Sequence, residues 1–258
     1  MDWGRAKSVL IISFLMLNVL LGYQLWVDIR EQLNANVNSA ELPPDKVQLM
    51  NQKRISISAN TNLPVSTPKL SDLSYLLKAD SRKLEKPALL EKPVDSALIF
   101  SKTELIRGLE EQIPDIASYT FDLHSSSESV AVFHRMVEGR PMFNVKLELY
   151  ISNLKITGFR QDRVDDIKLG EEQQVIPAAK VVASLIETYL EPGSVITDIQ
   201  LGYHGQIFDS EEQVSAPSWR VMLEDGEVFY VHAISGEVAT DGSSDQLTVG
   251  PSGVPVGE

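Results

Sequence analysis

FNVKLELYI, at residues 143–151, is the strongest indication of the fold class. Its apolar side chains stand at every second position and alternate with Asn, Lys, Glu and Tyr. This period of two predicts a β-strand with one buried and one exposed face. Residues 130–137 precede it as another apolar strand, and the turn sequence EGRP at residues 138–141 joins the two. Residues 119–123 alternate in the same way, so we expect an antiparallel meander.

A helix is predicted directly before this meander. Ser101 and Glu104 have the spacing of a capping box, in which the hydroxyl and the carboxylate bond to free backbone amides at a helix start. A helical stripe of apolar residues follows, and Pro114 ends it. The stripe consists of Leu105, Ile106, Leu109 and Ile113.

The same order returns further along the chain. A second amphipathic helix is predicted to begin at Pro177 and to end at Pro192-Gly193. Strands are predicted over residues 195–203, 219–223 and 228–234. Asp225-Gly226 between the last two favours a tight hairpin, because both residues tolerate positive φ.

These patterns predict an α+β fold, with two similar units that each place one helix before an antiparallel meander. EGRPMFNV at residues 138–145 even resembles EDGEVFYV at residues 224–231, which indicates a weak internal duplication. The segment LSDLSYLL at residues 70–77 has the apolar spacing of a short helix. The expected divisions are an N-terminus and anchor (1–27), a stalk or linker (28–53), a first unit (54–165, poorly defined over 54–100), a second unit (166–239) and a disordered tail (240–258).

The N-terminus contains twenty uncharged residues, SVLIISFLMLNVLLGYQLWV at positions 8–27. As a helix they would span about 30 Å, the thickness of the hydrocarbon layer of a membrane. A cleaved signal peptide is the alternative, but this run is long for one and no small-residue cleavage pattern follows closely. Arg5 and Lys7 precede the run, so we expect a single-pass cell-membrane protein with a cytoplasmic N-terminus and an extracytoplasmic remainder.

Three polar residues interrupt the apolar run: Ser13, Asn18 and Gln24. Amide and hydroxyl groups in hydrocarbon seek hydrogen-bond partners, which a neighbouring helix can supply. These residues are therefore candidate contacts with a partner helix in the membrane. The simpler interpretation is that an anchor tolerates them.

Composition excludes several functions. The 258 residues carry a net charge of -13 and no cysteine. Disulfides and thiolate chemistry are therefore absent, and so strong an acidic balance disfavours nucleic acid as a partner. The four histidines lack metal-ligand spacing, and no nucleotide-binding or hydrolase motif is present. We expect no cofactor, no metal and no catalysis.

Two groups of residues leave alternatives open. A polar acidic stretch between the units could serve a cell-wall hydrolase only if one carboxyl were buried, so a solvated linker is the simpler interpretation. It contains Asp162, Asp165, Asp166, Glu171 and Glu172. Trp219 and Tyr230 in the predicted hairpin are expected to be core residues or, alternatively, anchors for a partner.

The two ends of the chain carry a family resemblance. The opening MDWGRAKSVLIISFLMLN is similar to the start of the YycI family. Near the C-terminus, LGY (201–203), PSWRV (217–221) and FYVHAISGEV (229–238) resemble the same family, as does the helix VIPAAKVVASLIETYL (175–190). His232 and Ser218 stand where the family commonly has Asn and Thr.

The resemblance implies a membrane-anchored, non-enzymatic accessory protein of the WalK/WalR (YycG/YycF) two-component system of Gram-positive bacteria. Its implied partners are the sensor histidine kinase WalK, which controls cell-wall metabolism, and the related protein YycH. The hairpin also resembles PepSY modules more loosely, so an extracytoplasmic protease inhibitor or chaperone is a second reading of the same fold.

Overall fold

The computed structural model describes residues 14–23, 42–61, 63–78, 87–206, 208 and 210–240. It confirms the mixed α+β class, with strands in the majority. Residues 14–23 are helical with exposed side chains. Within the described ranges, no helix combines the length and apolar character needed to cross a membrane. Ser13, Gln24 and the tail from residue 241 onward lie outside the described residues.

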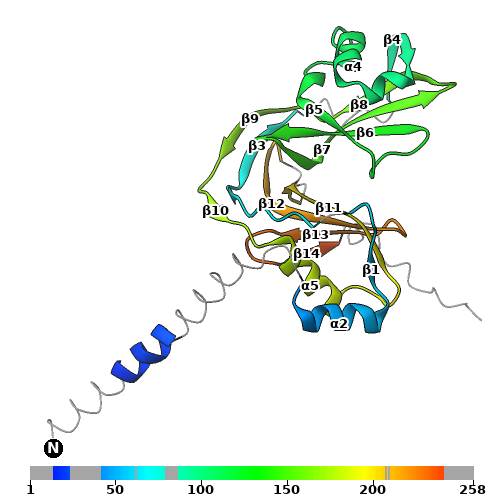
Figure 1. Ribbon diagram of the computed structural model, residues 1–258. Coiled ribbons are helices and arrows are strands. Elements are labelled where there is room, and N and C mark those ends of the chain that lie inside the picture. Colours follow the sequence, from blue (N-terminus) through cyan, green and yellow to red (C-terminus); the bar gives the residue numbers. More distant parts are fainter. Residues whose placement is uncertain are drawn as a thin grey trace, which may run out of the picture.

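The upper lobe in Figure 1 contains the first predicted helix and meander. Its elements are β4 (Ala88–Asp95), η1 (Ser96–Phe100), α4 (Lys102–Leu109), η2 (Ile116–Ser118), β5 (Tyr119–Asp122), β6 (Val130–Val137), β7 (Arg140–Ser152) and β8 (Lys155–Gln161). Strands β5 to β8 pair antiparallel in chain order; the alternating pattern predicts β5, β6 and β7 but not β8. Helix α4 begins directly after Ser101, but the Ser101 side chain makes no cap hydrogen bond, so that part of the capping-box prediction is wrong.

The lower lobe repeats the order of one helix before a meander. Its elements are α2 (Pro44–Lys53), β1 (Ser56–Ile57), α5 (Ala178–Thr188), β11 (Val195–His204), β12 (Glu212–Leu223), β13 (Val228–His232) and β14 (Val238–Thr240). Strands β11 to β14 pair antiparallel in order, with the predicted Asp225-Gly226 turn between β12 and β13. Gly226 has a φ of 92°, a backbone conformation that glycine adopts without steric strain, which explains why glycine occupies this turn position.

Short strands connect the lobes. They are β2 (Lys69–Leu70), β3 (Leu73–Leu77), β9 (Val164–Leu169) and β10 (Gln173–Gln174). The interpretation of residues 70–77 as a helix is wrong, because β3 lies between β9 and the first part of β12. The interpretation of the acidic stretch as a solvated linker is wrong for Asp165 and Asp166, because they lie in β9, which pairs with β3.

Part of the predicted stalk packs on the lower lobe. Helix α2 lies beside α5 (Figure 1), and Lys46 Nζ is 2.7 Å from a Glu187 carboxylate oxygen. Lys53 Nζ donates to the carbonyl oxygen of Ile186 at 2.6 Å, near the end of α5, where free carbonyls favour a cation. The described part of residues 28–53 therefore belongs to the folded domain.

Each lobe has its own apolar core. One cluster lies between α4 and the upper strands, and the other lies between α5 and the lower strands. The strand order β14-β13-β12-β11-β7-β6-β5 continues from one lobe to the other. The two lobes meet where β11 runs parallel to β7 at the pair Tyr203 and Met142.

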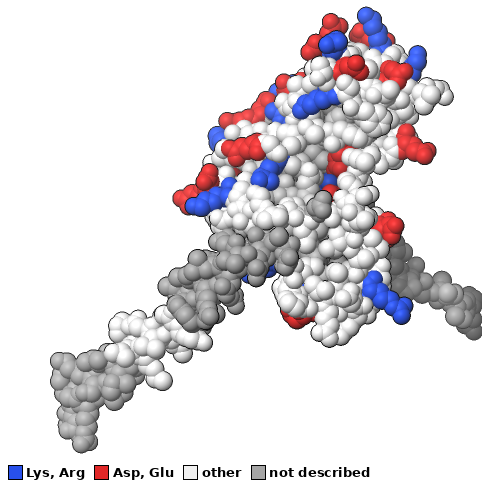
Figure 2. Space-filling model, viewed as in Figure 1, with Lys and Arg blue, Asp and Glu red and all other residues white. Residues whose placement is uncertain are grey.

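Charged side chains are distributed unevenly over the surface. Figure 2 shows Lys and Arg interspersed with Asp and Glu over the upper lobe, and few charges on the same face of the lower lobe. No large field of one sign covers this face.

Gly202 permits the close approach of β11 and β7. A Cβ at this position would collide with the carbonyl oxygen of Pro141 and would lie 2.7 Å from the Phe143 ring. We expect Gly202→Ala to lower the free energy of unfolding by about 1–3 kcal/mol, because a backbone oxygen cannot move aside as a flexible side chain can. Urea unfolding followed by circular dichroism measures this loss.

Gly170→Ala is the matched control. Its nearest neighbour across the fold, the Asp72 carbonyl oxygen, would lie 3.5 Å from the new Cβ, which is ordinary van der Waals contact. Equal stability of the Gly202→Ala and Gly170→Ala proteins would contradict the close-approach explanation.

Candidate functional site

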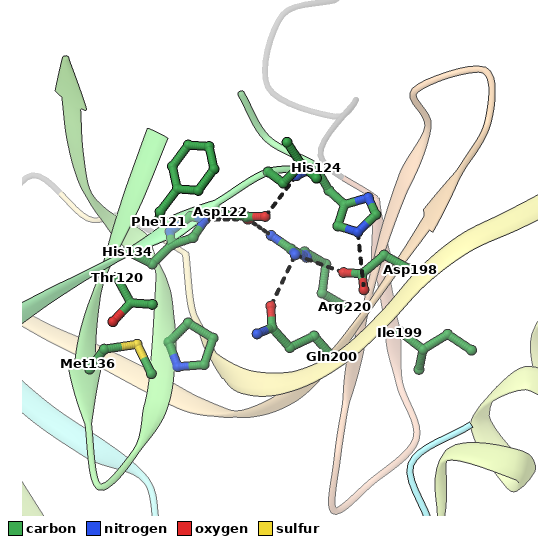
Figure 3. Close-up of a pocket in the computed structure, with 12 residues that line it drawn as sticks. Thr120, Phe121, Asp122, His124, His134, Met136, Asp198, Ile199, Gln200 and Arg220 are labelled. Carbon is green, nitrogen blue, oxygen red and sulfur yellow. Dashed lines mark hydrogen bonds and ion pairs between the residues drawn. The ribbon is translucent and has the colours of Figure 1, made fainter. Parts of the chain in front are cut away.

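A buried ion-pair cluster joins the two lobes. On β5 and β6, Thr120 pairs with His134, so the period of two places His134 and Asp122 on the face opposite to Phe121 and Phe133. On β12, Trp219 and Val221 belong to the lower core, and Arg220 between them faces the other way. The fold thereby directs Asp122 and Arg220 toward each other from separate lobes (Figure 3).

Asp122 is the acceptor at the centre of the cluster. Its Oδ2 accepts hydrogen bonds from His134 Nε2 at 3.0 Å, from Ser125 Oγ at 2.8 Å and from Arg220 Nη1. Its Oδ1 accepts from the backbone N–H of His124 at 3.1 Å. Both carboxylate oxygens are therefore satisfied, which a buried charge requires.

Arg220 is the donor at the centre, and only 2% of its surface is exposed. Its Nη2 donates to Asp198 Oδ2 at 2.8 Å and to Gln200 Oε1 at 3.0 Å, both on β11. Its guanidinium lies over the Phe143 ring of β7, with Cζ 4.8 Å from the ring centroid. One arginine therefore contacts three strands and the turn after β5.

Burial and pairing shift the pKa values of Asp122 and His134. Burial alone would raise the pKa of Asp122, but the hydrogen bonds from His134 and Arg220 outweigh it and hold this pKa well below its usual range. Burial lowers the pKa of His134, and its contact with Asp122 compensates only in part. His134 is thus neutral at pH 7. Its Nε2 carries the proton, because this atom faces a carboxylate, and its Nδ1 is an acceptor.

A cleft with a volume of about 370 Å³ opens beside the cluster. Residues of β5 and the following turn line it together with residues of β11, and Arg220 and His134 also border it. Figure 3 shows Asp198 and His124 facing each other across it, and their Oδ1 and Nε2 atoms are 3.8 Å apart. The lining residues are Thr120, Phe121, Asp122, Leu123, His124, His134, Met136, Pro141, Asp198, Ile199, Gln200 and Arg220.

Acidification should destabilise this cluster in two stages. A base with a folded-state pKa below its unfolded value of 6.5 binds fewer protons in the native state, so His134 makes the free energy of unfolding fall as pH drops below about 6.5. Asp122 is an acid, and its folded-state pKa also lies below its unfolded value of 3.8. Its contribution to the free energy of unfolding is therefore lost as pH falls below 3.8. Urea unfolding from pH 8 to pH 5 tests the first stage.

His134→Gln separates the histidine from other titrations. Glutamine keeps an N–H donor for Asp122 and does not titrate, so the loss between pH 7 and pH 5 should shrink. His124→Gln, which changes a side chain at the same cleft that is 43% exposed, should leave that loss in place. Equal pH profiles for His134→Gln and the wild type would contradict the assignment.

The sequence-derived candidates lie elsewhere. Trp219 is fully buried in the lower core, where its Nε1–H donates to the Ile176 carbonyl oxygen at 2.9 Å. Tyr230 is also buried, and its ring stacks on His204 with centroids 3.7 Å apart. Both therefore pack inside the fold and do not form an exposed anchor. Asn18 lies on the exposed helix of residues 14–23.

The acidic stretch does not form a buried carboxyl pair in the described fold. Asp165 and Asp166 are exposed, with Lys78 at 2.6 Å from the first and Lys168 at 2.8 Å from the second. Asp162 is half-buried, and its Oδ2 accepts from the backbone N–H of Lys146. Glu171 and Glu172 are exposed as well. Among the described residues, no group of three or more His, Asp or Glu side chains is arranged to hold a metal ion.

Sequence reasoning missed the cluster. The available signal was an arginine within the apolar strand SWRVML and a histidine within VAVFHRMV. An ionisable residue at such a position needs a buried partner. Asp122 and Asp198 show no comparable local pattern, because their role depends on a partner 98 and 22 residues away.

The fold and the cluster define a class: a two-lobed α+β protein whose lobes are joined by buried ion pairs. The family model described as YycI protein matches residues 22–234, so the chain belongs to the YycI family. This membership implies a regulatory role in the WalK (YycG) two-component pathway. The LGY and PSWRV motifs include Gly202 and Arg220, two residues at the joint between the lobes.

No curated protein matches the chain. Among solved structures, the chain is similar to an uncharacterized protein from Eubacterium rectale ATCC 33656, with 12% identity and a TM-score of 0.34. The similarity covers 45% of this chain and 44% of that one, so the chain spans less than half of its length.

Proposed function

We propose that this protein is a non-enzymatic accessory regulator of the sensor histidine kinase WalK, acting in the cell membrane together with a YycH-like protein. The family match over residues 22–234 carries this proposal, since it includes both lobes. The uncharged run of residues 8–27 supplies the anchor, and both lobes lie outside the cytoplasm.

A binding protein changes a kinase only when it favours one of the signalling states of that kinase. A difference of about 1–3 kcal/mol in contact energy between two states changes activity by about 5–150-fold. A single hydrogen bond between membrane helices contributes only about 0.6 kcal/mol. The anchor therefore needs packing contacts, or contacts of the two lobes, in addition to Ser13, Asn18 and Gln24.

Exchange of residues 8–27 for an unrelated membrane span tests the role of the anchor. We expect WalK-dependent reporter output to change, because the exchange removes side-chain packing but keeps membrane attachment. Immunodetection of equal amounts of both proteins in the membrane is the control. Unchanged output would remove the anchor from the signalling mechanism.

Assays on cell-wall polymers test the absence of catalysis. We expect no turnover by the purified full chain that depends on Asp165 and Asp166, because both are exposed and paired with lysines, whereas an acid–base pair of this kind needs one carboxyl in a buried site. Turnover that disappears in Asp165→Asn/Asp166→Asn would make the protein a hydrolase.

Co-purification from membranes tests the other alternative. Recovery of a protease in place of WalK would favour the PepSY-like inhibitor or chaperone.

A further inference from the structure

Strand β5 offers an open edge between two cavities. In the described part of the chain, β5 ends the strand order and pairs with β6 alone. Its other edge therefore presents backbone groups to which a further strand can add. Thr120 and Phe121 border the interlobe cleft and also a second cavity with a volume of about 230 Å³.

The second cavity is apolar. It lies on the α4 side of β5, and aromatic rings of Phe100, Phe121 and Phe133 line it. Phe100 on η1 is 79% exposed, and its ring meets Phe121 edge-on at a centroid distance of 6.0 Å. An aromatic side chain exposed to this degree beside an apolar cavity is typical of a site that buries an apolar group of a partner.

The interlobe cleft, on the opposite face of β5, favours a hydrogen-bond donor with positive charge. His134 Nδ1 is buried without a partner and is an acceptor in the neutral imidazole. Asp198 stays partly exposed, with 20% of its side-chain surface accessible. The two carboxylates and the one guanidinium of the cleft leave a net charge of about -1 when the imidazoles are neutral. Arg220 Nε also lacks a partner, but the guanidinium lies over the Phe143 ring.

The period of two in a strand combines the two cavities into one site. Neighbouring side chains of an added strand point to opposite faces of the sheet. A strand beside β5 would therefore direct one side chain into the apolar cavity and the next into the acidic cleft. Recognition of extended peptides at sheet edges works in this way: the backbone supplies affinity and alternate side chains supply specificity.

We propose that β5 binds an extended segment of a partner protein as an additional strand, with an apolar residue in the Phe100 cavity and an adjacent Lys or Arg in the cleft beside Asp198. The tail of this chain, residues 241–258, contains Asp and Glu but no Lys or Arg, so it does not supply the cation. The inference deepens the proposed regulatory function and rests on it only for the identity of the partner.

The test uses the full chain in nanodiscs and the peptide Ser-Thr-Leu-Lys-Thr-Ser-amide with a fluorophore on its N-terminus, and binding is followed by fluorescence anisotropy. We expect saturable binding that weakens about tenfold in Asp198→Asn, because the acceptor loses the negative charge that strengthens its hydrogen bond to the peptide cation. Phe100→Ser should weaken it about fivefold or more. Leu89→Ser, which removes a side chain that is 81% exposed on β4, is the matched control and should bind as the wild type does.

Peptide variants test the mode of binding. Replacement of the peptide Lys by Glu should abolish binding, and N-methylation of alternate backbone amides should do the same by removing the strand hydrogen bonds. Absence of saturable binding, equal binding of the Glu peptide, or equal binding by all protein variants would overturn the inference. Dissociation of a full-chain dimer by Phe100→Ser in sedimentation would also overturn it, since a second copy would then occupy the edge. No kinase takes part in these measurements, so their failure leaves the regulatory proposal standing.

Discussion

Arg220→Met should lower the free energy of unfolding by about 3–5 kcal/mol, among the largest losses that we expect for any single substitution in this chain. The change leaves the Asp122 and Asp198 carboxylates buried or partly buried without their common cation. Methionine fills a similar volume, so the loss reports charge and hydrogen bonding more than a cavity. Urea unfolding of the full chain, followed by circular dichroism, measures it.

Two variants make this result interpretable. Arg160→Met removes an exposed arginine from β8 and should change stability by less than about 0.5 kcal/mol. Arg220→Met combined with Asp122→Asn removes one of the stranded charges, so the double variant should recover part of the loss. A loss for Arg220→Met no larger than that for Arg160→Met would show that the ion pairs do not hold the lobes together.

Trp219→Ala should cost about 3–5 kcal/mol as well, for a different physical reason. The indole is fully buried between β12 and α5, and its removal leaves a cavity and an unpaired Ile176 carbonyl oxygen. Trp219→Phe keeps most of the ring but loses the N–H donor, so we expect a smaller loss. The temperature of unfolding, measured by circular dichroism, ranks the three proteins.

Phe100→Ala is the control for aromatic truncation. Phe100 is 79% exposed, whereas Trp219 is fully buried, so Phe100→Ala should change the free energy of unfolding by less than about 0.5 kcal/mol. Similar losses in Trp219→Ala and Phe100→Ala would contradict the placement of Trp219 in the core and would restore its interpretation as a surface anchor.

Local patterns predicted many of the helices, strands and turns of the two lobes, because these elements depend on residues that are close together in the sequence. Residues 143–151 lie in β7, and Asp225-Gly226 forms the turn between β12 and β13. The apolar stripe predicted up to Ile113 is helical only as far as Leu109, where α4 ends. The prediction of a helix over residues 70–77 was wrong because the apolar spacing there is ambiguous. Leu70, Leu73 and Leu77 fit a helical spacing, whereas Leu73, Tyr75 and Leu77 fit a strand equally well, and pairing with β9 and β12 decided between them.

Periodicity, turn residues and end motifs already indicate the α+β class and the family, since they are properties of neighbouring residues. The meeting of Asp122, His134, Asp198 and Arg220 follows only from the three-dimensional fold, as does the open edge of β5 in the described part of the chain. A buried charge is stable only beside its partners. Those partners are brought together by the parallel contact of β11 with β7, which no local pattern encodes.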